Sequence, residues 1–343
     1  MERIVINIPG SVSEVLVGEK LESVKNMLPE NGVVIITDEN VNRIYGERFP
    51  DFPVFTITPG EESKRLSTIE DLAGRLMDAG IDRDGFILAI GGGVVCDIAG
   101  FLGSVYMRGI RFAYISTTLL SQVDASTGGK NGVNAGHAKN MLGCFSQPEF
   151  VICDTGMLAT LPEDEYLSGL AELIKTGIIG DEKLFEVIEN SLDGIMRRDT
   201  ELLTFLVSLS VNFKASVVQA DEKESGVRRI LNFGHTYGHA IEMHTSCLHG
   251  MAVASGMELA AAYSHHRGML AEKDMKRIIS LLERARLLPE YDMSQDLVEH
   301  YILRDKKKSG SDIYFVFTSG IGRASSEKVP VLELVEFYKG YKG

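Results

Sequence analysis

The chain has 343 residues, 44% of them hydrophobic and 24% charged, which is the composition of a folded protein of about two domains. This composition excludes a disordered chain, a collagen-like repeat and a small disulfide scaffold. The net charge of −13 argues against nucleic acid or an anionic membrane as a partner, because proteins that bind either are usually basic.

The sequence pattern predicts neither a signal peptide nor a membrane span. The N-terminal segment lacks the apolar core of a signal peptide, and no run approaches the roughly 18 apolar residues of a membrane span. The four cysteines are widely spaced and form no C-x-x-C pair, which is typical of reduced thiols in a cytoplasmic protein. These cysteines are Cys96, Cys144, Cys153 and Cys247.

Short apolar runs in the first half predict strands, and the amphipathic stretches between them predict helices. Runs that are almost continuously apolar suit strands buried on both faces of a parallel sheet. Strand–helix alternation of this kind indicates an α/β fold. The predicted strands are 4–8, 33–37, 54–58, 86–90, 112–116 and 150–153, and an amphipathic helix is predicted over 63–79.

Helical patterns dominate from residue 162 onward, with one strand-like run at 313–318. We therefore predict an α/β domain over 1–161 and a helical domain over 162–343. Ligands of open α/β sheets lie beyond the carboxyl ends of the strands, so we expect the active site in a cleft between the domains. The predicted helices are 163–179, 182–195, 201–219, 233–245, 251–266 and 273–285.

Three consecutive glycines, Gly91 to Gly93, follow a predicted strand and precede a helical pattern at 94–106. Glycines at such a turn let the backbone approach a diphosphate at the helix N-terminus. The spacing differs from G-x-G-x-x-G, so a tight turn explains the glycines equally well. Asp97, in the first turns of the helix, is either a site residue or a partner of the helix dipole.

Two more polar segments follow predicted strands. Residues 59–64 (PGEESK) carry carboxylates that capping of the next helix would explain. Residues 117–130 and the Gly/Asn-rich loop after them contain Lys130, Lys139 and Asn140, and such loops can hold phosphate. A solvated loop is the alternative interpretation.

Half of the eight histidines lie within fifteen residues: His235, His239, His244 and His249. His235 and His239 share one helical face, although the segment is not the H-E-x-x-H pattern. The cluster favours metal binding or catalysis over isolated imidazoles. A catalytic zinc needs three protein ligands and an open position, so a carboxylate from elsewhere could complete the set.

Glu172 is a candidate for that carboxylate, because it lies in an otherwise apolar and small-residue helix, SGLAELIKTGII. A lone carboxylate there is costly to bury without a partner. Lys175 lies three residues later on the same face. Considered alone, the two residues would be interpreted as a surface ion pair.

Basic and amide side chains lie near the histidines in the sequence. Lys214, Arg228 and Asn232 precede them, and a guanidinium suits bidentate contact with phosphate or carboxylate. The basic run 305–308 (DKKK) is the kind of segment that usually forms a solvated loop.

Six segments follow one another along the chain between Asp38 and Lys308: GGGVVCDIAGF, YMRGIRFAYISTTLLSQVDASTGGKNGVN, KNMLG, GLAELIKTGII, RRILNFGHTYGHAIE and HGMAVASGM. This ordered set closely resembles the 3-dehydroquinate synthase family of sugar-phosphate cyclases. The resemblance implies a Rossmann-like domain that binds NAD, a helical domain that binds zinc (or cobalt) and substrate, and a homodimer.

The resemblance also assigns roles to residues. It implies that Glu172, His235 and His249 are the zinc ligands, whereas His239 faces the substrate. The implied NAD contacts are Asp38, Glu61, Glu62, Lys64, Gly92, Gly93, Val94, Asp97, Thr117, Thr118, Lys130, Lys139, Met157, Leu158 and Thr160. The implied substrate contacts are Arg108, Asp124, Lys130, Asn140, Lys175, Lys214, Arg228, Asn232, His239 and either Lys306 or Lys307.

The implied reaction belongs to the shikimate pathway. It converts 3-deoxy-D-arabino-heptulosonate 7-phosphate into 3-dehydroquinate and phosphate. The steps are transient NAD-dependent oxidation, phosphate elimination, re-reduction, ring opening and aldol cyclisation. The alternatives are a cyclase that acts on another sugar phosphate, a metal-dependent polyol dehydrogenase that would accumulate NADH, and a non-catalytic nucleotide-binding relative.

The chain departs from the family pattern at three positions. Cys96 stands where glycine is common, Asn131 where threonine or valine is usual, and Thr127 where isoleucine is usual. These departures bear on the fine geometry of cofactor binding and leave the reaction class unchanged.

Overall fold

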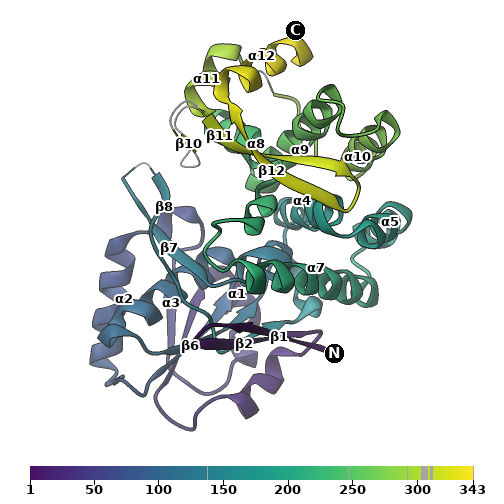
Figure 1. The fold of residues 1–343 in the computed structure, drawn as a ribbon. Coiled ribbons are helices and arrows are strands. Elements are labelled where there is room, and N and C mark those ends of the chain that lie inside the picture. The colour runs from purple at the N-terminus through teal and green to yellow at the C-terminus, as the bar shows by residue number, and fades with distance from the viewer. Residues whose placement is uncertain (137, 246, 292, 303–307, 310–311, 343) are drawn as a thin grey trace. The chain divides into compact units, whose positions relative to one another are not determined.

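The structure, a computed structural model, describes residues 1–343 except 137, 246, 292, 303–307, 310–311 and 343 (Figure 1). The chain forms two compact units. The first comprises Met1–Leu161 and Leu203–Gln219, and the second comprises Pro162–Leu202 and Ala220–Gly343. The sequence analysis assigns 203–219 to the helical domain, whereas in the structure this segment packs within the first unit.

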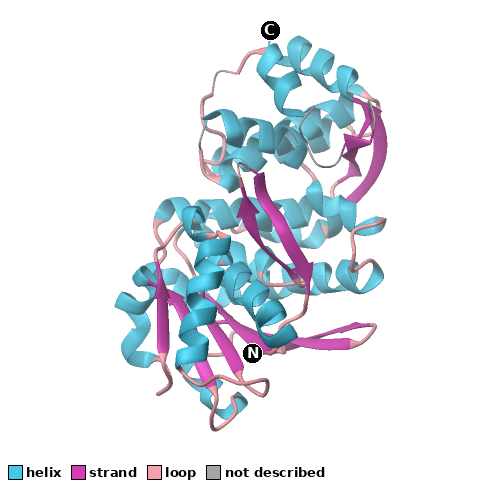
Figure 2. Ribbon diagram, turned by 90° about the vertical axis from the view of Figure 1, so that its left-hand side faces the viewer, coloured by secondary structure: helices cyan, strands magenta, loops and turns pink. Residues whose placement is uncertain are grey.

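The first unit is built around a seven-stranded sheet of order β1-β2-β9-β6-β5-β3-β4 (Figures 1 and 2). All neighbouring strands are parallel except β1 and β2, which form an antiparallel hairpin. The α/β class is thus confirmed, and β2 is a strand that the apolar pattern does not predict. The strands are β1 (Glu2–Ile8), β2 (Ser11–Val17), β3 (Val33–Asp38), β4 (Val54–Ile57), β5 (Phe86–Gly91), β6 (Arg111–Ser116) and β9 (Phe150–Cys153).

The central strands are apolar throughout because both faces of the sheet are covered. Every residue of β5 is buried, and so is every residue of β9. Successive side chains of a strand point to opposite faces. Leu88 and Ile90 pack in one core cluster, so Ile87 and Ala89 face the opposite side, which α3 covers. This two-sided burial explains the continuous apolar runs of the sequence.

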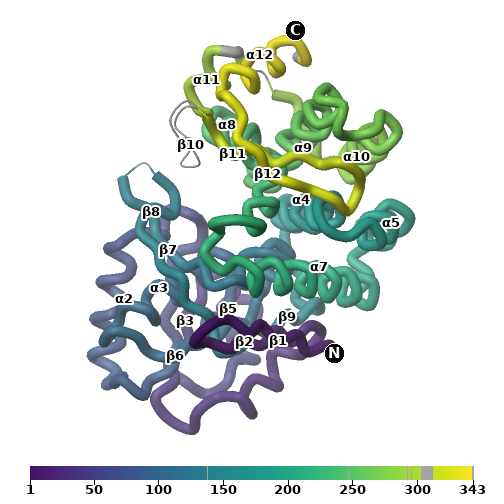
Figure 3. The backbone as a smooth tube through the Cα atoms, in the orientation of Figure 1, coloured from purple at the N-terminus to yellow at the C-terminus, as the bar shows by residue number. Residues whose placement is uncertain are grey.

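The order of the strands places a topological switch point between β3 and β5 (Figure 3). The chain runs from β3 to its neighbour β4 and then crosses to β5 on the other side of β3. Ligands of open α/β sheets bind beyond the carboxyl ends of the strands at such a point. The helices that follow these strands are α1 (Glu39–Tyr45), α2 (Leu66–Asp78) and α3 (Gly93–Val105).

A separate antiparallel hairpin, β7 (Lys130–Ala135) and β8 (Ala138–Phe145), corrects the expectation of a loop after residue 130. Nearly every residue of β8 is exposed or half-buried. The sequence therefore lacks the apolar alternation that marks a half-buried strand, and its glycines and asparagines indicate a loop instead.

Helix α7 (Thr200–Ala220) is long and apolar enough to cross a membrane by length and composition, contrary to the expectation that no segment would be. In the structure 56% of its apolar window is buried. Thr204 contacts Thr155, and Ser210 donates a hydrogen bond to the carbonyl of Val123. These contacts make α7 a packing helix of the first unit.

The second unit is helical, as predicted, but it also contains a small antiparallel sheet. The run at 313–318 lies in β11 (Asp312–Gly320), which pairs with β12 (Arg323–Pro330) and with the short β10 (Lys308–Ser309). Strand β12 was not predicted from the sequence, because it consists mainly of polar residues. The helices are α4 (Glu163–Gly180), α5 (Glu182–Asn190), α6 (Leu192–Met196), α8 (His235–Thr245), α9 (His249–His266), α10 (Glu272–Arg284), α11 (Gln295–Ile302) and α12 (Val331–Lys342).

Glycines let α9 approach α4 and the start of α8 closely. A Cβ on Gly256 would lie 1.9 Å from the carbonyl oxygen of Gly234, and a Cβ on Gly250 would lie 2.2 Å from that of Ser168. Real Cβ atoms do not approach backbone oxygen this closely. The backbone contact at Gly256 therefore fixes the distance between the two histidine-bearing helices.

We expect Gly256→Ala to lower the free energy of unfolding by about 1–3 kcal/mol, because the added methyl forces α8 and α9 apart. Gly74→Ala in α2 is the matched control, since nothing lies within 4 Å of its Cβ position. A helix-interior alanine there should stabilise by about 1 kcal/mol. Thermal melts followed by circular dichroism measure both shifts, and a melt of the Gly256 variant at or above wild type would contradict the packing described here.

Candidate functional site

The second unit buries one carboxylate among three nitrogen-bearing side chains. Glu172, in the middle of α4, is 1% exposed. Its carboxylate pairs with the ammonium of Lys175 one turn later. Its Oε1 lies 3.4 Å from Nε2 of His249 and 3.7 Å from Nε2 of His235. The helix is apolar around Glu172 because almost all of α4 is core.

Each imidazole of this cluster is oriented through its other ring nitrogen. Nδ1 of His235 lies 3.2 Å from the carbonyl oxygen of Phe233, and Nδ1 of His249 lies 3.2 Å from a carboxylate oxygen of Glu242. In the neutral imidazole, an Nδ1–H that donates to such an acceptor leaves the lone pair on Nε2, where a metal can take it. Partners of this kind fix the tautomer and direction of metal-binding histidines.

The cluster of Glu172, His235 and His249 fits a divalent metal. Their ligand atoms lie within 4.8 Å of one another. Both oxygens of Glu172 are buried, and neither accepts a hydrogen bond of ordinary geometry among the described residues. Two imidazoles and one carboxylate are a ligand set of catalytic zinc sites with an open position. A cation here would add positive charge beside the buried carboxylate, which is paired with Lys175.

The charges of the cluster shift its pKa values in opposite directions. Burial alone would raise the pKa of Glu172, but Lys175 and His249 lower it to about 2. Burial alone would lower the pKa of His249, but the carboxylates of Glu172 and Glu242 raise it to about 9. Without metal, the histidine is therefore protonated at neutral pH and the glutamate is ionised.

His239 lies beside the cluster and outside the three-residue set. Its ring centroid is 5.3 Å from that of His235 and 6.3 Å from that of His249. It is half-buried, so its imidazole can reach a molecule bound next to the metal position. The structure thus separates His239 from the three ligand atoms that converge.

The predicted carboxylate-binding residues lie in the loop before α8. Arg228 is 2% exposed, and its guanidinium donates to the carbonyl of Glu222. The amide of Asn232 donates to the carboxylate of Glu224. Asp221 organises this loop by accepting hydrogen bonds from the backbone N–H groups of Ser225, Gly226 and Arg228. Lys306 and Lys307 lie outside the described residues.

The glycine turn of the first unit lies at the switch point of the sheet. Gly92 follows directly after β5, and α3 begins at the next residue, Gly93. A Cβ on Gly92 would lie 2.8 Å from Cγ2 of Thr118, so the turn is tightly packed. The first backbone N–H groups of a helix are unpaired within the helix and attract phosphate. Val94 belongs to this first turn.

Lys64 is the centre of a polar network at the same edge of the sheet. It is 4% exposed, and its Nζ lies 2.6 Å from Oδ2 of Asp97 and 2.5 Å from Oδ1 of Asn140. Glu61 lies 3.8 Å away across the same turn. Burial raises the pKa of Asp97, and the ammonium of Lys64 opposes that rise. The structure thus joins three predicted site residues that are far apart in the sequence.

A second buried ion pair joins Lys214 of α7 to Asp124 of the π-helical turn η5 (Ser121–Ala125). Lys214 also donates to the carbonyl of Asp124 and is 7% exposed. Single π-helical turns are frequent at functional sites. Lys130, at the start of β7, is exposed.

The remaining predicted cofactor residues have structural roles of their own. Asp38 caps α1 through hydrogen bonds from Asn40 and Val41. Thr117 and Thr118 follow β6, and the side chains of Met157 and Leu158 are buried in the core. Other placements are as follows: Thr160 contacts the hydroxyl of Tyr45, Glu62 pairs with Arg65, and Lys139 and Arg108 are exposed.

Two departures from the family pattern are accommodated in the core. Cys96 is 1% exposed, and its Sγ lies 3.9 Å from the carbonyl oxygen of Gly91. Asn131 accepts a hydrogen bond from the hydroxyl of Tyr114 at 2.7 Å and donates to Ser146. The third, Thr127, is also buried.

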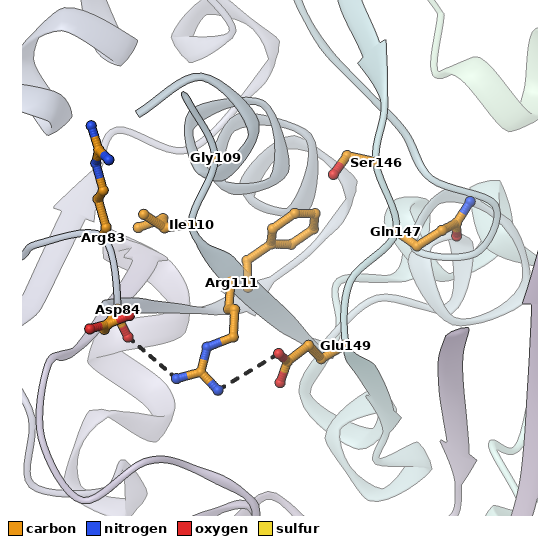
Figure 4. Close-up of a pocket in the computed structure, with 9 residues that line it drawn as sticks. Arg83, Asp84, Gly109, Ile110, Arg111, Ser146, Gln147 and Glu149 are labelled. Atoms are coloured by element: carbon orange, nitrogen blue, oxygen red, sulfur yellow. Dashed lines mark hydrogen bonds and ion pairs between the residues drawn. The ribbon is translucent and has the colours of Figure 1, made fainter. Parts of the chain in front are cut away.

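A cavity of about 350 Å³ lies at the opposite edge of the sheet, beside the amino ends of β5 and β6 (Figure 4). Arg111 at its centre contacts the carbonyl of Asp84 and the carboxylate of Glu149. Because the glycine turn follows the carboxyl end of β5, this cavity is separate from the candidate nucleotide site.

Sequence reasoning missed the residues that orient the site. Asp221 and Glu224 lie outside the motif segments, whereas Asn134 and Glu242 end two of these segments without a role being assigned to them. Glu242 comes seven residues before His249, and only the turn between α8 and α9 brings them together. For Asn134 and Glu242, the signal in the sequence was their place at the end of these motif segments.

Comparisons with known proteins show the family of the chain. A family model described as "3-dehydroquinate synthase N-terminal" matches residues 54–168, and one described as "3-dehydroquinate synthase C-terminal" matches residues 169–308. The 3-dehydroquinate synthase of Thermoanaerobacter pseudethanolicus is 42% identical over 330 residues, which cover 93% of each chain.

Two solved structures have the same fold over nearly the whole chain. A 2-deoxy-scyllo-inosose synthase complexed with carbaglucose-6-phosphate, NAD⁺ and Co²⁺ is 26% identical, with a TM-score of 0.87 and 98% of each chain covered. The 2-epi-5-epi-valiolone synthase of Streptomyces hygroscopicus subsp. jinggangensis, with NAD⁺ and Zn²⁺ bound, is 27% identical, with a TM-score of 0.87 and 96% of each chain covered. The chain therefore belongs to the 3-dehydroquinate synthase family.

Proposed function

We propose that this chain catalyses the 3-dehydroquinate synthase reaction, converting 3-deoxy-D-arabino-heptulosonate 7-phosphate into 3-dehydroquinate and inorganic phosphate. The observation that carries the proposal is the buried set of Glu172, His235 and His249, with Lys175 and His239 beside it, in a chain of this family. NAD and zinc are the cofactors, and the two solved relatives hold NAD⁺ with Co²⁺ or Zn²⁺.

Glu172, His235 and His249 would hold a zinc ion, which would supply Lewis-acid chemistry to a substrate hydroxyl. Lys175 balances the charge of Glu172. His239 offers a ring nitrogen that can accept or return a proton beside the metal position. These side chains are held by packing before substrate arrives, because Glu172, Lys175 and His235 are each 9% exposed or less.

The first unit binds NAD, which supplies the acceptor and donor of a hydride. The start of α3 at Gly92 and Gly93 holds the diphosphate through backbone N–H groups. The ion-paired side chains of Lys64, Glu61 and Asp97 are the polar groups next to the diphosphate.

Basic and amide side chains of this chain suit the two anionic groups of the substrate. Arg228 in the second unit presents a planar guanidinium, which suits a carboxylate. Lys130, Lys214 and Asn140 in the first unit suit phosphate. This chemistry explains how a chain of charge −13 gathers a substrate with two anionic groups.

The test is phosphate release from 3-deoxy-D-arabino-heptulosonate 7-phosphate with zinc and NAD, while absorbance at 340 nm is recorded. We expect NAD-dependent phosphate release with no lasting NADH signal. Release from glucose 6-phosphate instead would indicate a cyclase for a substrate without carboxylate. NADH that accumulates with a polyol would indicate a dehydrogenase, and no turnover at all by folded, zinc-loaded protein would contradict the proposal.

Zinc binding should depend on pH, because the metal displaces a proton from His249. The pKa of His249 is raised to about 9, so its imidazole is protonated at pH 7 and neutral above pH 9. Zinc affinity should therefore rise between pH 7 and pH 9 by up to about tenfold per pH unit. Competition with a chromogenic chelator measures this affinity, and His249→Ala should lose both the tight binding and the pH dependence.

We also infer a homodimer in the cytoplasm. The hairpin β7–β8 exposes apolar side chains on β8, with Met141 55%, Leu142 37% and Phe145 43% exposed. Exposed apolar groups gathered on one element favour an interface with another chain. All four cysteines are free, which supports a reducing compartment.

Sedimentation velocity tests the dimer directly. We expect wild-type protein to sediment as a dimer at micromolar concentration and the double variant Met141→Glu/Leu142→Glu to sediment as a monomer, because buried carboxylates would oppose association. Zinc content should be the same in both, as the metal ligands lie elsewhere in the chain. A wild-type monomer at all concentrations would refute the dimer.

A further inference from the structure

Three hydrogen bonds join the tip of the β7–β8 hairpin to the turn Glu61–Lys64, a fourth joins the two strands of the hairpin, and we call this set of four the amide latch. The backbone N–H of Asn134 donates to the carbonyl of Lys64 at 2.8 Å, and its Nδ2 donates to Oε1 of Glu61 at 2.9 Å. Its Oδ1 accepts the backbone N–H of Asn140 at 2.8 Å. The fourth bond runs from Nζ of Lys64 to Oδ1 of Asn140, at 2.5 Å.

Asn134 lies at an irregularity of the hairpin. Val133 pairs with Leu142 and Ala135 with Ala138, so one residue on β7 stands opposite three on β8. Within this bulge Asn140 adopts a positive φ of 51°. Bulges redirect side chains, and a left-handed residue is stable only where its surroundings hold it. The hydrogen bond from the backbone N–H of Asn140 to Oδ1 of Asn134 supplies this support.

Only a side-chain amide of this length satisfies both partners of Asn134. Its nitrogen faces a carboxylate, which needs a donor, and its oxygen faces an N–H, which needs an acceptor. Aspartate would keep the acceptor but would bring a second carboxylate to Glu61. Alanine would remove both side-chain bonds.

We propose that Asn134 is a positioning residue that holds Asn140 for the substrate phosphate and Glu61 for NAD, and so links these two parts of the first unit. The inference rests on the proposed function, which assigns Asn140 to substrate and Glu61 and Lys64 to NAD. Asn134 itself acts through these residues. Its side chain is fully engaged by Glu61 and Asn140, and it is half-buried.

Two substitutions distinguish the hydrogen bond that Asn134 donates to Glu61 from the one that it accepts from Asn140. Asn134→Ala should raise both the KM for 3-deoxy-D-arabino-heptulosonate 7-phosphate and the Kd for NAD by about tenfold, as expected for the loss of one hydrogen bond to Asn140 and one to Glu61. Asn134→Asp should raise the Kd for NAD by at least as much but change KM less, because Asn140 keeps its acceptor. In both variants kcat should fall less than kcat/KM.

A double-mutant cycle distinguishes positioning from a general loss of structure. In the Asn140→Ala background, Asn134→Ala should no longer raise KM, whereas it should still raise the Kd for NAD. Asn212→Ala is the matched control, since Asn212 is also an asparagine of the first unit and loses its side-chain hydrogen bonds to Glu2 and to the carbonyl of Ser208. It should lower the melting temperature and leave the Kd for NAD within about twofold.

Calorimetry gives the Kd for NAD, and phosphate release gives KM. A wild-type protein that binds NAD and releases phosphate, with Asn134 variants within twofold of it in both constants, would overturn the inference alone. The same holds if Asn134→Ala raises KM equally in the Asn140→Ala background. A wild-type protein that neither binds NAD nor releases phosphate would instead overturn the proposed function.

Discussion

The burial of one ionised carboxylate constrains the whole second unit. Glu172 lies in the middle of a helix whose surroundings are apolar, and an ion there requires compensating charge close by. Lys175 comes from the same helix, but the two imidazoles must be brought by α8 and α9. The glycines at 250 and 256 permit that approach, since any side chain there would strike backbone. Close helix packing and charge compensation are therefore parts of one arrangement.

The first unit solves a comparable problem with an ammonium. Lys64 is buried at the carboxyl edge of the sheet, and its partners come from three different elements: Asp97 from α3, Asn140 from β8 and Glu61 from its own turn. Each partner also belongs to the predicted nucleotide or phosphate site. The network that offsets the cost of burying the Lys64 ammonium therefore also holds the residues of that site in position. The glycine turn beside it leaves the start of α3 open to a diphosphate.

The sequence was informative where local pattern and burial coincide. Strands β3, β5, β6 and β9 were predictable because both faces of the sheet are covered and the runs are apolar throughout. The hairpin β7–β8 was not, because β8 is exposed and rich in polar residues. Spacing alone grouped His235 with His239, one turn apart on α8. The resemblance named His249 instead, and the ligand atom of His249 is the one that converges on Glu172. Asn134 and Glu242 could not be found, because their partners are distant in the sequence.

The path of the chain through α7 bears on whether either half can exist alone. The first unit takes Leu203–Gln219 from a later part of the chain, so the polypeptide passes between the units three times. A protein cut after Leu161 would lack the helix that supplies Lys214 to Asp124 and hydrogen-bonds with Thr155 and with the backbone at Val123 and Asn7. The nucleotide-binding half is thus not an autonomous module that recombination could move to another protein by a single exchange. Both halves must be inherited, and must change, together.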